Sequence, residues 1–258
     1  MPPSSFIWYE LLTADADAAA RFYAALLRWT SADSGQPGID YRYLSMQGVP
    51  IGGLMTLPLG ASDAGMRPSW LGYVSVPNVD SSVASFVAAG GAVLMPAVDL
   101  PGIGRIAMVA DPQGAALYVM APIGAGPATS FAPGKAGHGG WHELHARDAQ
   151  AALAFYANQF GWRKVAELDM GPMGAYLQFD CGSGAMAGGI IKDPSAARPY
   201  WLYCFNVEDI DAARTRLLAN GGTVLMDRHQ VPTGEWIIRA SDPQGAVFVL
   251  IGPKHAGR

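Results

Sequence analysis

The sequence is poor in charge and has no long apolar run. Only 15% of its 258 residues are charged, and the net charge is -4. It therefore lacks the basic surface that the phosphates of DNA or RNA attract, and we expect no nucleic-acid partner. Half of the residues are hydrophobic, yet no uninterrupted apolar stretch approaches the roughly 20 residues of a membrane-spanning helix. A membrane partner is not expected either.

Cysteine is also scarce. The two cysteines, Cys181 and Cys204, lie in the second half of the chain and have no counterparts in the first half. We predict two reduced thiols in the core, with a disulfide or a reactive thiol as the alternative. The N-terminal segment lacks the basic stretch followed by an apolar stretch that marks a signal peptide, so a cytoplasmic protein is expected.

The main feature that is present is an internal duplication. Residues Trp8, Glu10, Asp15, Phe22, Tyr23 and Trp29 recur 133 positions later as Trp141, Glu143, Asp148, Phe155, Tyr156 and Trp162. The run Asp-Pro-Gln-Gly-Ala at 111–115 returns intact at 242–246. A fixed period of this kind indicates two copies of one fold. We predict a first domain at 1–122, a linker rich in Ala, Gly and Pro at 123–139, and a second domain at 140–258.

Each copy shows the order strand, helix, strands twice. Four aspartates, Asp15, Asp80, Asp148 and Asp211, lie where helical spacing of apolar residues begins, and each is predicted to cap a helix. Two adjacent glycines interrupt a strand pattern at 52–53 and again at 188–189, which indicates a bulge or a close backbone approach. The chain is therefore predicted to contain four similar modules.

With these motifs the chain resembles the vicinal oxygen chelate superfamily, which includes glyoxalase I, bleomycin-resistance proteins and extradiol dioxygenases. The resemblance rests on Trp-x-Glu-Leu followed by Asp, Phe-Tyr and Trp, on a Pro-x-Trp segment, and on the Asp-Pro-Gln-Gly-Ala turn, each present twice. It implies an α+β fold in which four βαβββ modules form two domains. In each domain a curled, mixed sheet would enclose a cup for a small ligand.

The resemblance also implies three metal-ligand positions per domain, on the first, fifth and last strands. The residues found there are Trp8, Trp70 and Tyr118 in the first copy and Trp141, Trp201 and Val249 in the second. Divalent metals prefer imidazole, thiolate or carboxylate ligands, and even Tyr118 is a poor substitute. This departure predicts no metal cofactor. Aromatic residues at these points instead indicate a cup for a flat or apolar small molecule.

Two glutamates are the main candidates for chemistry. Residues two apart on a strand share a face, so Glu10 points with Trp8, while Glu143 points with Trp141 and His145. By the resemblance that face is the cup, where a carboxylate could act as a general base or accept a hydrogen bond from the ligand. The alternative is a structural salt bridge from each glutamate to an arginine of a facing strand, such as Arg105 or Arg239.

Three histidines lie within eight residues, at His138, His142 and His145. His142 and His145 are three apart on a strand and should face opposite sides, with His142 toward the helices. The three are therefore not expected to bind one metal ion together. A divalent metal held by Glu143 and His145 would need a third ligand, such as Glu235.

We therefore predict a metal-independent, small-molecule-binding protein with aromatic-lined cups. Its site residues would be Trp8, Glu10, Trp70 and Tyr118 in the first copy and Trp141, Glu143, His145 and Trp201 in the second. One alternative is a lyase or dioxygenase that uses Glu10 or Glu143 as a base, or Glu143 and His145 as metal ligands. Another is an interaction protein whose own side chains fill its cups. A monomer or a homodimer is expected.

Overall fold

The computed structural model describes residues 4–36, 38–58, 60–61, 65–124, 128–182 and 184–255. The first module contains β1 (Phe6–Thr13), α1 (Ala16–Leu27), β2 (Thr30–Asp33), β3 (Tyr41–Met46) and β4 (Val49–Thr56). The second contains β5 (Ser69–Ser75), α2 (Val79–Ala88), β6 (Ala92–Leu100), β7 (Gly104–Ala110) and β8 (Ala116–Pro122). Part of the predicted linker, 125–127, lies outside the described residues.

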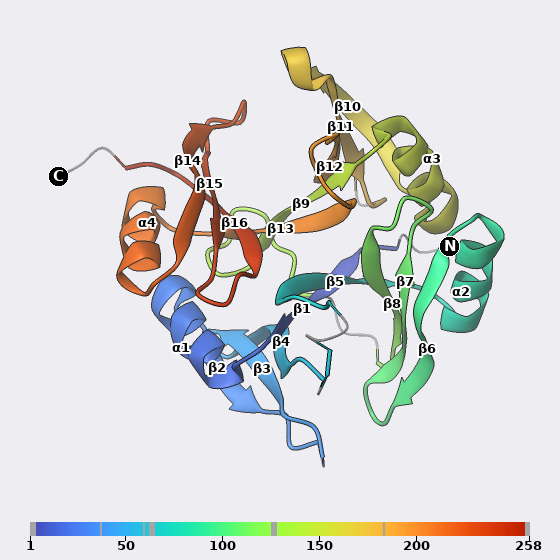
Figure 1. Cartoon of the computed structure of the whole chain (residues 1–258), viewed down its shortest axis with the longest axis horizontal. Helices are drawn as coiled ribbons and strands as arrows, with labels where there is room; N and C mark the ends of the chain where they lie inside the picture. The colour runs from blue at the N-terminus through green and yellow to red at the C-terminus, as the bar shows by residue number, and fades with distance from the viewer. Residues whose placement is uncertain are drawn as a thin grey trace. The chain divides into compact units, whose positions relative to one another are not determined.

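The second copy repeats this order (Figure 1). Its first module contains β9 (Gly139–Ala146), α3 (Ala149–Phe160), β10 (Arg163–Asp169), the short 3-10 turn η1 (Gly171–Met173), β11 (Ala175–Asp180) and β12 (Met186–Lys192). Its second contains β13 (Tyr200–Asn206), α4 (Ile210–Ala219), β14 (Thr223–Gln230), β15 (Trp236–Ser241) and β16 (Val247–Gly252). The four predicted βαβββ modules are confirmed.

Each copy contributes one eight-stranded sheet. The strand orders are β2-β3-β4-β1-β5-β8-β7-β6 and β10-β11-β12-β9-β13-β16-β15-β14. β1 pairs with β4 in parallel and β5 with β8 in parallel, while the pairs β3 with β4 and β7 with β8 are antiparallel. The sheets are therefore mixed, and the predicted α+β class is confirmed. In the described part of the chain, no helix combines the length and apolar character needed to cross a bilayer.

The compact units of the structure interleave the two copies. One unit comprises Trp8–Trp70, Thr129–Gly140 and Tyr203–Arg258, and the other comprises Met1–Ile7, Leu71–Ala128 and Trp141–Leu202. We call the first the outer unit, because it groups the first and fourth modules of the chain, and the second the inner unit. The domain limits inferred from the repeat divide the chain differently and remain a prediction.

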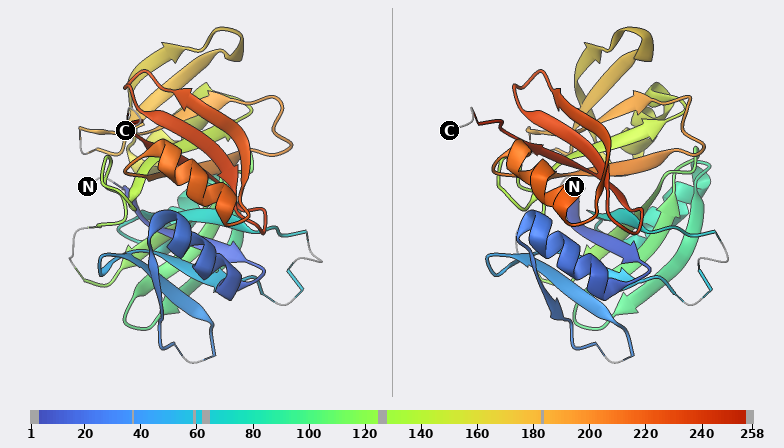
Figure 2. Two further views of the ribbon diagram at one scale, coloured as in Figure 1. Left: turned by 90° about the vertical axis from the view of Figure 1, so that its left-hand side faces the viewer. Right: turned by 60° about the vertical axis from the view of Figure 1, so that its left-hand side comes forward.

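In the outer unit, the turn that follows β15 binds the start of α1. The side-chain Oε1 of Gln244 accepts a hydrogen bond from the backbone N of Asp15 at 2.6 Å, and its Nε2 donates to the backbone O of Asp15 at 2.8 Å. The hydroxyl of Tyr23 on α1 donates to Asp242 at 3.2 Å and accepts from Trp70 Nε1 at 2.9 Å. Helices α1 and α4 lie side by side in both views of Figure 2.

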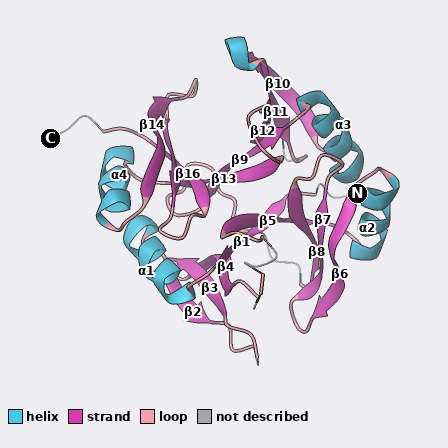
Figure 3. Cartoon of the chain, in the orientation of Figure 1, coloured by secondary structure: helices cyan, strands magenta, loops and turns pink. Residues whose placement is uncertain are grey.

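The inner unit repeats the arrangement. Gln113 makes the same two hydrogen bonds to the backbone of Asp148, at 2.8 and 2.9 Å. The hydroxyl of Tyr156 on α3 donates to Asp111 at 3.1 Å and accepts from Trp201 Nε1 at 3.2 Å. Helices α2 and α3 contact each other within this unit (Figure 3). The most strongly repeated motifs therefore join modules from different copies.

Two of the four predicted helix caps are wrong. Helices α1 and α3 begin after the predicted aspartates, but the cap of α2 is Asn78 and that of α4 is Asp209. These caps lie two residues before Asp80 and Asp211, the predicted positions. A short polar side chain at the earlier position already accepts the exposed backbone N–H of the first turn. The later carboxylates are thereby left to bind arginines.

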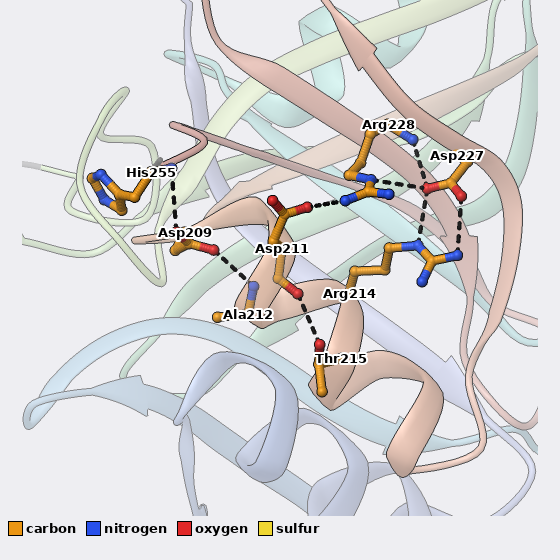
Figure 4. Close-up of polar contacts among 8 residues, drawn as sticks. All are labelled: Asp209, Asp211, Ala212, Arg214, Thr215, Asp227, Arg228 and His255. Carbon is orange, nitrogen blue, oxygen red and sulfur yellow. Dashed lines mark hydrogen bonds and ion pairs between the residues drawn. The ribbon is translucent and has the colours of Figure 1, made fainter. Parts of the chain in front are cut away.

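Two arginines and two aspartates form a surface network between α4 and β14 (Figure 4). Asp211 pairs with Arg228 of β14, and both nitrogens at the edge of the Arg214 guanidinium bind Asp227 at 2.9 and 3.0 Å. The network links the helix to the neighbouring strand. Because most of these side chains are well exposed, we expect it to stabilise the fold only weakly.

Cys181 and Cys204 are both buried and neither forms a disulfide, which confirms the prediction of two core thiols. Burial raises the pKa of the Cys181 thiol, with a further contribution from the charge of Asp180. A thiol of this kind stays protonated and is a poor nucleophile.

Candidate functional site

Strand β9 separates a core face from a more accessible face. His142 is fully buried, and its ring stacks on Phe6 with centroids 3.8 Å apart. Phe6 in turn contacts Trp162, which stacks on Tyr156 of α3. The prediction that His142 points toward the helix layer is confirmed. The alternating residues Trp141, Glu143 and His145 therefore belong to the opposite face of the strand.

On that face a tryptophan, a tyrosine and a glutamate form a hydrogen-bonded chain. Trp141 Nε1 donates to the hydroxyl of Tyr176 at 2.7 Å, and this hydroxyl donates to Glu143 Oε2 at 2.9 Å. Tyr176 comes from β11, 35 positions away from Trp141 in the sequence. Trp141, Glu143 and Tyr176 are all half-buried, so the group is ordered by its own hydrogen bonds and still reachable from solvent.

His145 extends this chain to a second carboxylate. Its Nε2 lies 2.9 Å from Glu143 Oε1, and its Nδ1 lies 2.9 Å from Asp193 Oδ2. Ionised carboxylates only accept hydrogen bonds, so each ring nitrogen of His145 has an acceptor oxygen within hydrogen-bond distance. Hydrogen bonds from Ser195, together with that from His145, lower the pKa of Asp193 to about 2. We call Trp141, Glu143, His145, Tyr176, Asp193 and Tyr200 the inner cluster.

Tyr200 completes the inner cluster, and the sequence prediction missed it by one residue. Its ring stacks on His145 with centroids 4.5 Å apart and planes 8° from parallel. The prediction named Trp201, but that indole donates to Tyr156 in the core and is 6% exposed. Neighbouring residues on a strand point to opposite faces, so Tyr200 and Trp201 lie on different sides of the sheet.

Trp70 in the outer unit likewise points to the core, one sequence position after a residue of the opposite face. It is 4% exposed, its Nε1 is bonded to Tyr23, and its ring packs against Trp29 and Phe205. The residue before it, Ser69, corresponds to Tyr200. The structure thus places both Trp70 and Trp201 among the core aromatics, and their predicted role in binding a ligand is untested.

The first copy contains the same chain of three side chains. Trp8 Nε1 donates to the hydroxyl of Tyr41 at 2.8 Å, and Tyr41 is hydrogen-bonded to Glu10. Burial, followed by the negative charge of Glu10, raises the pKa of Tyr41. Tyr43 meets the Trp8 ring edge-on, with centroids 6.1 Å apart. Unlike Glu143, Glu10 is only 4% exposed.

The paired glycines make room for these tyrosines. A Cβ added at Gly53 would overlap the phenol of Tyr41, and one added at Gly189 would overlap the ring of Tyr176. The preceding glycine of each pair meets a backbone oxygen of the neighbouring strand. The predicted close approach is confirmed. The paired glycines, together with a tyrosine on the neighbouring strand of each copy, could have identified Tyr41 and Tyr176 from the sequence.

The charged part of the inner cluster has no equivalent in the first copy. Leu12 stands where the second copy has His145, and Leu57 corresponds to Asp193. Both leucines are buried. The two copies therefore share the Trp–Tyr–Glu group and differ in whether a histidine and a second carboxylate accompany it.

The remaining predicted positions contain no metal-binding group. Tyr118 on β8 is 6% exposed and stacks on Tyr73, with centroids 4.3 Å apart, and Val249 is buried on β16. Across the residues that the structure describes, no three His, Cys, Asp or Glu side chains are arranged to hold a metal ion. Both ring nitrogens of His145 face carboxylates, so this histidine has no nitrogen directed toward a metal ion. The residues at the family's ligand positions and in the inner cluster therefore do not fit a divalent metal.

The alternative of a structural salt bridge to Arg105 is not supported. The guanidinium of Arg105 binds Asp80 with Nε and Nη2 and Asp99 with Nη1, at 2.9 to 3.0 Å. It is therefore already neutralised by two carboxylates. Glu143 instead has Tyr176 and His145 as hydrogen-bond partners.

Comparison with known protein sequences identifies one family. A family model matches residues 140–250, and the family is described as Glyoxalase/Bleomycin resistance protein/Dioxygenase superfamily. The protein CFP32 of Mycobacterium tuberculosis, named as a candidate glyoxylase, is 32% identical over 249 residues, covering 95% of this chain and 94% of that protein. The anthracycline biosynthesis protein DnrV of Streptomyces peucetius is 30% identical over 265 residues, covering 96% and 93%.

Among solved structures, the Mn(II)-bound glyoxalase from Novosphingobium aromaticivorans matches 98% of this chain and 83% of its own, with a TM-score of 0.67 and 17% identity. The halotolerant catechol dioxygenase BphC matches with a TM-score of 0.68 and 12% identity, covering 97% and 87%. At these identities the likeness concerns the fold.

Proposed function

Because the chain belongs to the glyoxalase, bleomycin resistance protein and dioxygenase superfamily, we propose that it binds a flat, largely apolar organic molecule and does so without a metal ion. The observation that carries the proposal is the Trp–Tyr–Glu group, which recurs in both copies on the first and third strands. A function as an interaction protein that fills its own cups would not require this ordered group, with a half-buried tryptophan and tyrosine, in each copy.

The group has the properties of a preformed binding site. The hydrogen bond from Trp141 to Tyr176 fixes the orientation of both rings and satisfies the indole N–H. Glu143 then supplies a hydrogen-bond acceptor beside an apolar surface. Sites for small molecules commonly combine aromatic walls with a few placed polar groups. Rings that are already ordered lose little conformational freedom when a ligand binds.

Independence from metal is supported by the residues at the family's ligand positions. Two tryptophans, Trp8 and Trp141, occupy the first position, and Tyr118 and Val249 occupy the last. Elemental analysis of protein purified without chelators or metal-affinity steps would test this point. We expect well below one zinc, iron, manganese or nickel per chain. Stoichiometric metal would contradict metal independence and favour the lyase or dioxygenase alternative.

The class of ligand is suggested by the rings and by the relatives. Two of the relatives are named as anthracycline biosynthesis proteins, and anthracyclines contain fused, flat rings. Acridine is a suitable uncharged probe of similar flatness. We expect it to raise the melting temperature and to quench tryptophan fluorescence in a saturable way. The double variant Trp8→Leu, Trp141→Leu should lose both effects, whereas Trp236→Leu on β15 should keep them. Absence of any effect in the unmodified chain would contradict the proposal.

An acid–base enzyme is a second candidate, because His145 connects two carboxylates through hydrogen bonds of 2.9 Å. Such a chain can hold and move a proton next to a bound molecule. A binding protein and an enzyme are distinguished by incubating the protein with the aromatic probe and then analysing the probe for chemical change. Recovery of unchanged probe supports a binding protein. A product that disappears in Glu143→Gln, with probe binding retained, would support the enzyme.

A further inference from the structure

We infer that the chain has one ligand site, at the inner cluster, and that a planar ring of the ligand lies there in the place that Tyr43 takes in the first copy. This inference rests on the proposed binding function and adds to it the number of sites and the position of the ligand. Three observations support it: the ring that Tyr43 adds to the first copy, the residue that replaces Tyr43 in the second copy, and the different exposure of the two glutamates.

The first observation is a third ring beside the Trp–Tyr–Glu group of the first copy. Tyr43 and Tyr41 are two residues apart on β3, so their side chains share a face of the sheet. The ring of Tyr43 meets that of Trp8 edge-on, with centroids 6.1 Å apart, and that of Tyr41 edge-on, with centroids 5.7 Å apart. Aromatic rings attract each other in this arrangement. In the first copy the indole and the phenol of the group therefore pack against a ring that the chain itself supplies.

The second observation is that the second copy has no aromatic residue at the position of Tyr43. Strand pairing sets Tyr43 opposite Gly53 in the first copy and Gln178 opposite Gly189 in the second. Gly53 and Gly189 are the second members of the two glycine pairs, so Gln178 corresponds to Tyr43. Gln178 is half-buried, and its amide is smaller than a phenol. Beside the second Trp–Tyr–Glu group, this position therefore supplies no ring.

A ligand can supply the ring instead. Trp141 is bonded to Tyr176 at 2.7 Å, much as Trp8 is bonded to Tyr41 at 2.8 Å, so the two pairs of rings are held in the same way. The first copy shows how a planar ring packs against such a pair, edge-on to both members. We expect a ring of the ligand to meet Trp141 and Tyr176 in this manner.

The third observation concerns access. Glu10 in the first copy is 4% exposed, whereas Glu143 in the second copy is half-buried. The second Trp–Tyr–Glu group is therefore the one that a molecule from solvent reaches without rearrangement of the chain. Tyr200, which is also half-buried, adds aromatic surface to the inner cluster where the first copy has Ser69. These differences place the one site of the chain in the inner unit.

The number of bound ligands tests the inference. In equilibrium dialysis against acridine, with the bound acridine measured by its absorbance, the unmodified chain should approach one acridine per chain at saturation. Trp141→Leu should weaken binding at least about tenfold, because it removes one of the two rings against which the ligand packs. Trp8→Leu is the matched substitution in the first copy and should change the affinity less than about twofold.

Substitution of Gln178 tests the position of the ligand. Gln178→Tyr introduces the residue of the first copy, and its ring should fill the place proposed for the ligand, so acridine should bind at least about tenfold more weakly. Gln178→Asn keeps an amide without a ring and should retain the affinity within about threefold. Circular dichroism checks that each variant is folded. If Gln178→Tyr does not fold, the two tryptophan variants decide the location of the site by themselves.

The outcomes separate the inference from the function beneath it. Two acridines per chain, or a loss in Trp8→Leu as large as that in Trp141→Leu, would overturn the single site and leave small-molecule binding in place. Undiminished binding by folded Gln178→Tyr would overturn the position of the ligand. If the unmodified chain binds no acridine, the proposed function itself is contradicted. One acridine per chain that is lost in Trp141→Leu and Gln178→Tyr, and retained in Trp8→Leu and Gln178→Asn, supports both.

Discussion

A buried histidine should make this protein sensitive to mild acid. His142 is fully buried between its stacking partner Phe6 and the backbone oxygen of Ala187, to which its Nδ1 donates at 2.7 Å. Burial lowers its pKa from 6.5 to about 3, and the hydrogen bond to Ala187 opposes this shift only in part. The folded chain therefore holds the neutral ring at pH values at which the unfolded chain has taken up a proton.

The sign and size of the effect follow from proton linkage. Between pH 6.5 and about 3 the unfolded state binds one more proton at His142, so stability falls as the pH falls. Each pH unit in this range costs about 1.4 kcal/mol, and lowering the pH from 7 to 4.5 should cost about 3 kcal/mol. The low pKa of Asp193 acts at a more acidic pH, since the stability that it contributes is present above 3.8 and is lost as the pH falls toward about 2.

Urea unfolding at pH 7 and pH 4.5 measures this dependence. The comparison is with His142→Phe, which keeps a ring against Phe6 but cannot titrate. It should be less stable at pH 7 by about 1 to 3 kcal/mol, because the oxygen of Ala187 loses its donor. Its loss between pH 7 and 4.5 should be smaller than that of the unmodified chain by about 3 kcal/mol. Burial raises the pKa of Asp111 and Asp242, but their contributions cancel in this difference. Parallel pH dependences in the two proteins would refute the reasoning.

Three further predictions concern contacts that both copies share. Gly189→Ala should displace the ring of Tyr176 and lower the free energy of unfolding by about 1 to 3 kcal/mol in urea titrations. It should also abolish acridine binding. Retained binding would show that Tyr176 is not needed. Gln113→Ala and Gln244→Ala should each cost about 1 to 2 kcal/mol through two lost hydrogen bonds, and the double variant should show the sum, because they share no partner. Tyr156→Phe should lower the melting temperature at a cost of about 1 to 3 kcal/mol, since it leaves two buried polar groups without a partner; an unchanged melting temperature would contradict the role of this hydroxyl.

The residues of the proposed site that the sequence analysis missed share one property. Tyr41 and Tyr176 lie on the third strand of each copy, and Tyr200 and Asp193 lie 55 and 48 positions from His145. Strand periodicity shows which residues of one strand share a face, but it does not show which residues of other strands lie beside them. Only the pairing of β9 with β12, and of β11 with β12, places Tyr176 close to Glu143.

The sequence by itself determined the duplication, the order of the elements, the α+β class and the family, because these depend on local spacing and on repeated motifs. It also determined that Trp141, Glu143 and His145 share a face. Only the tertiary structure decided that Tyr200 rather than Trp201 lies on that face, and that the modules group as first with fourth and second with third. The physical reason is that strand register and module packing depend on contacts between residues far apart in the chain, and a shift of one residue in register reverses the direction of a side chain.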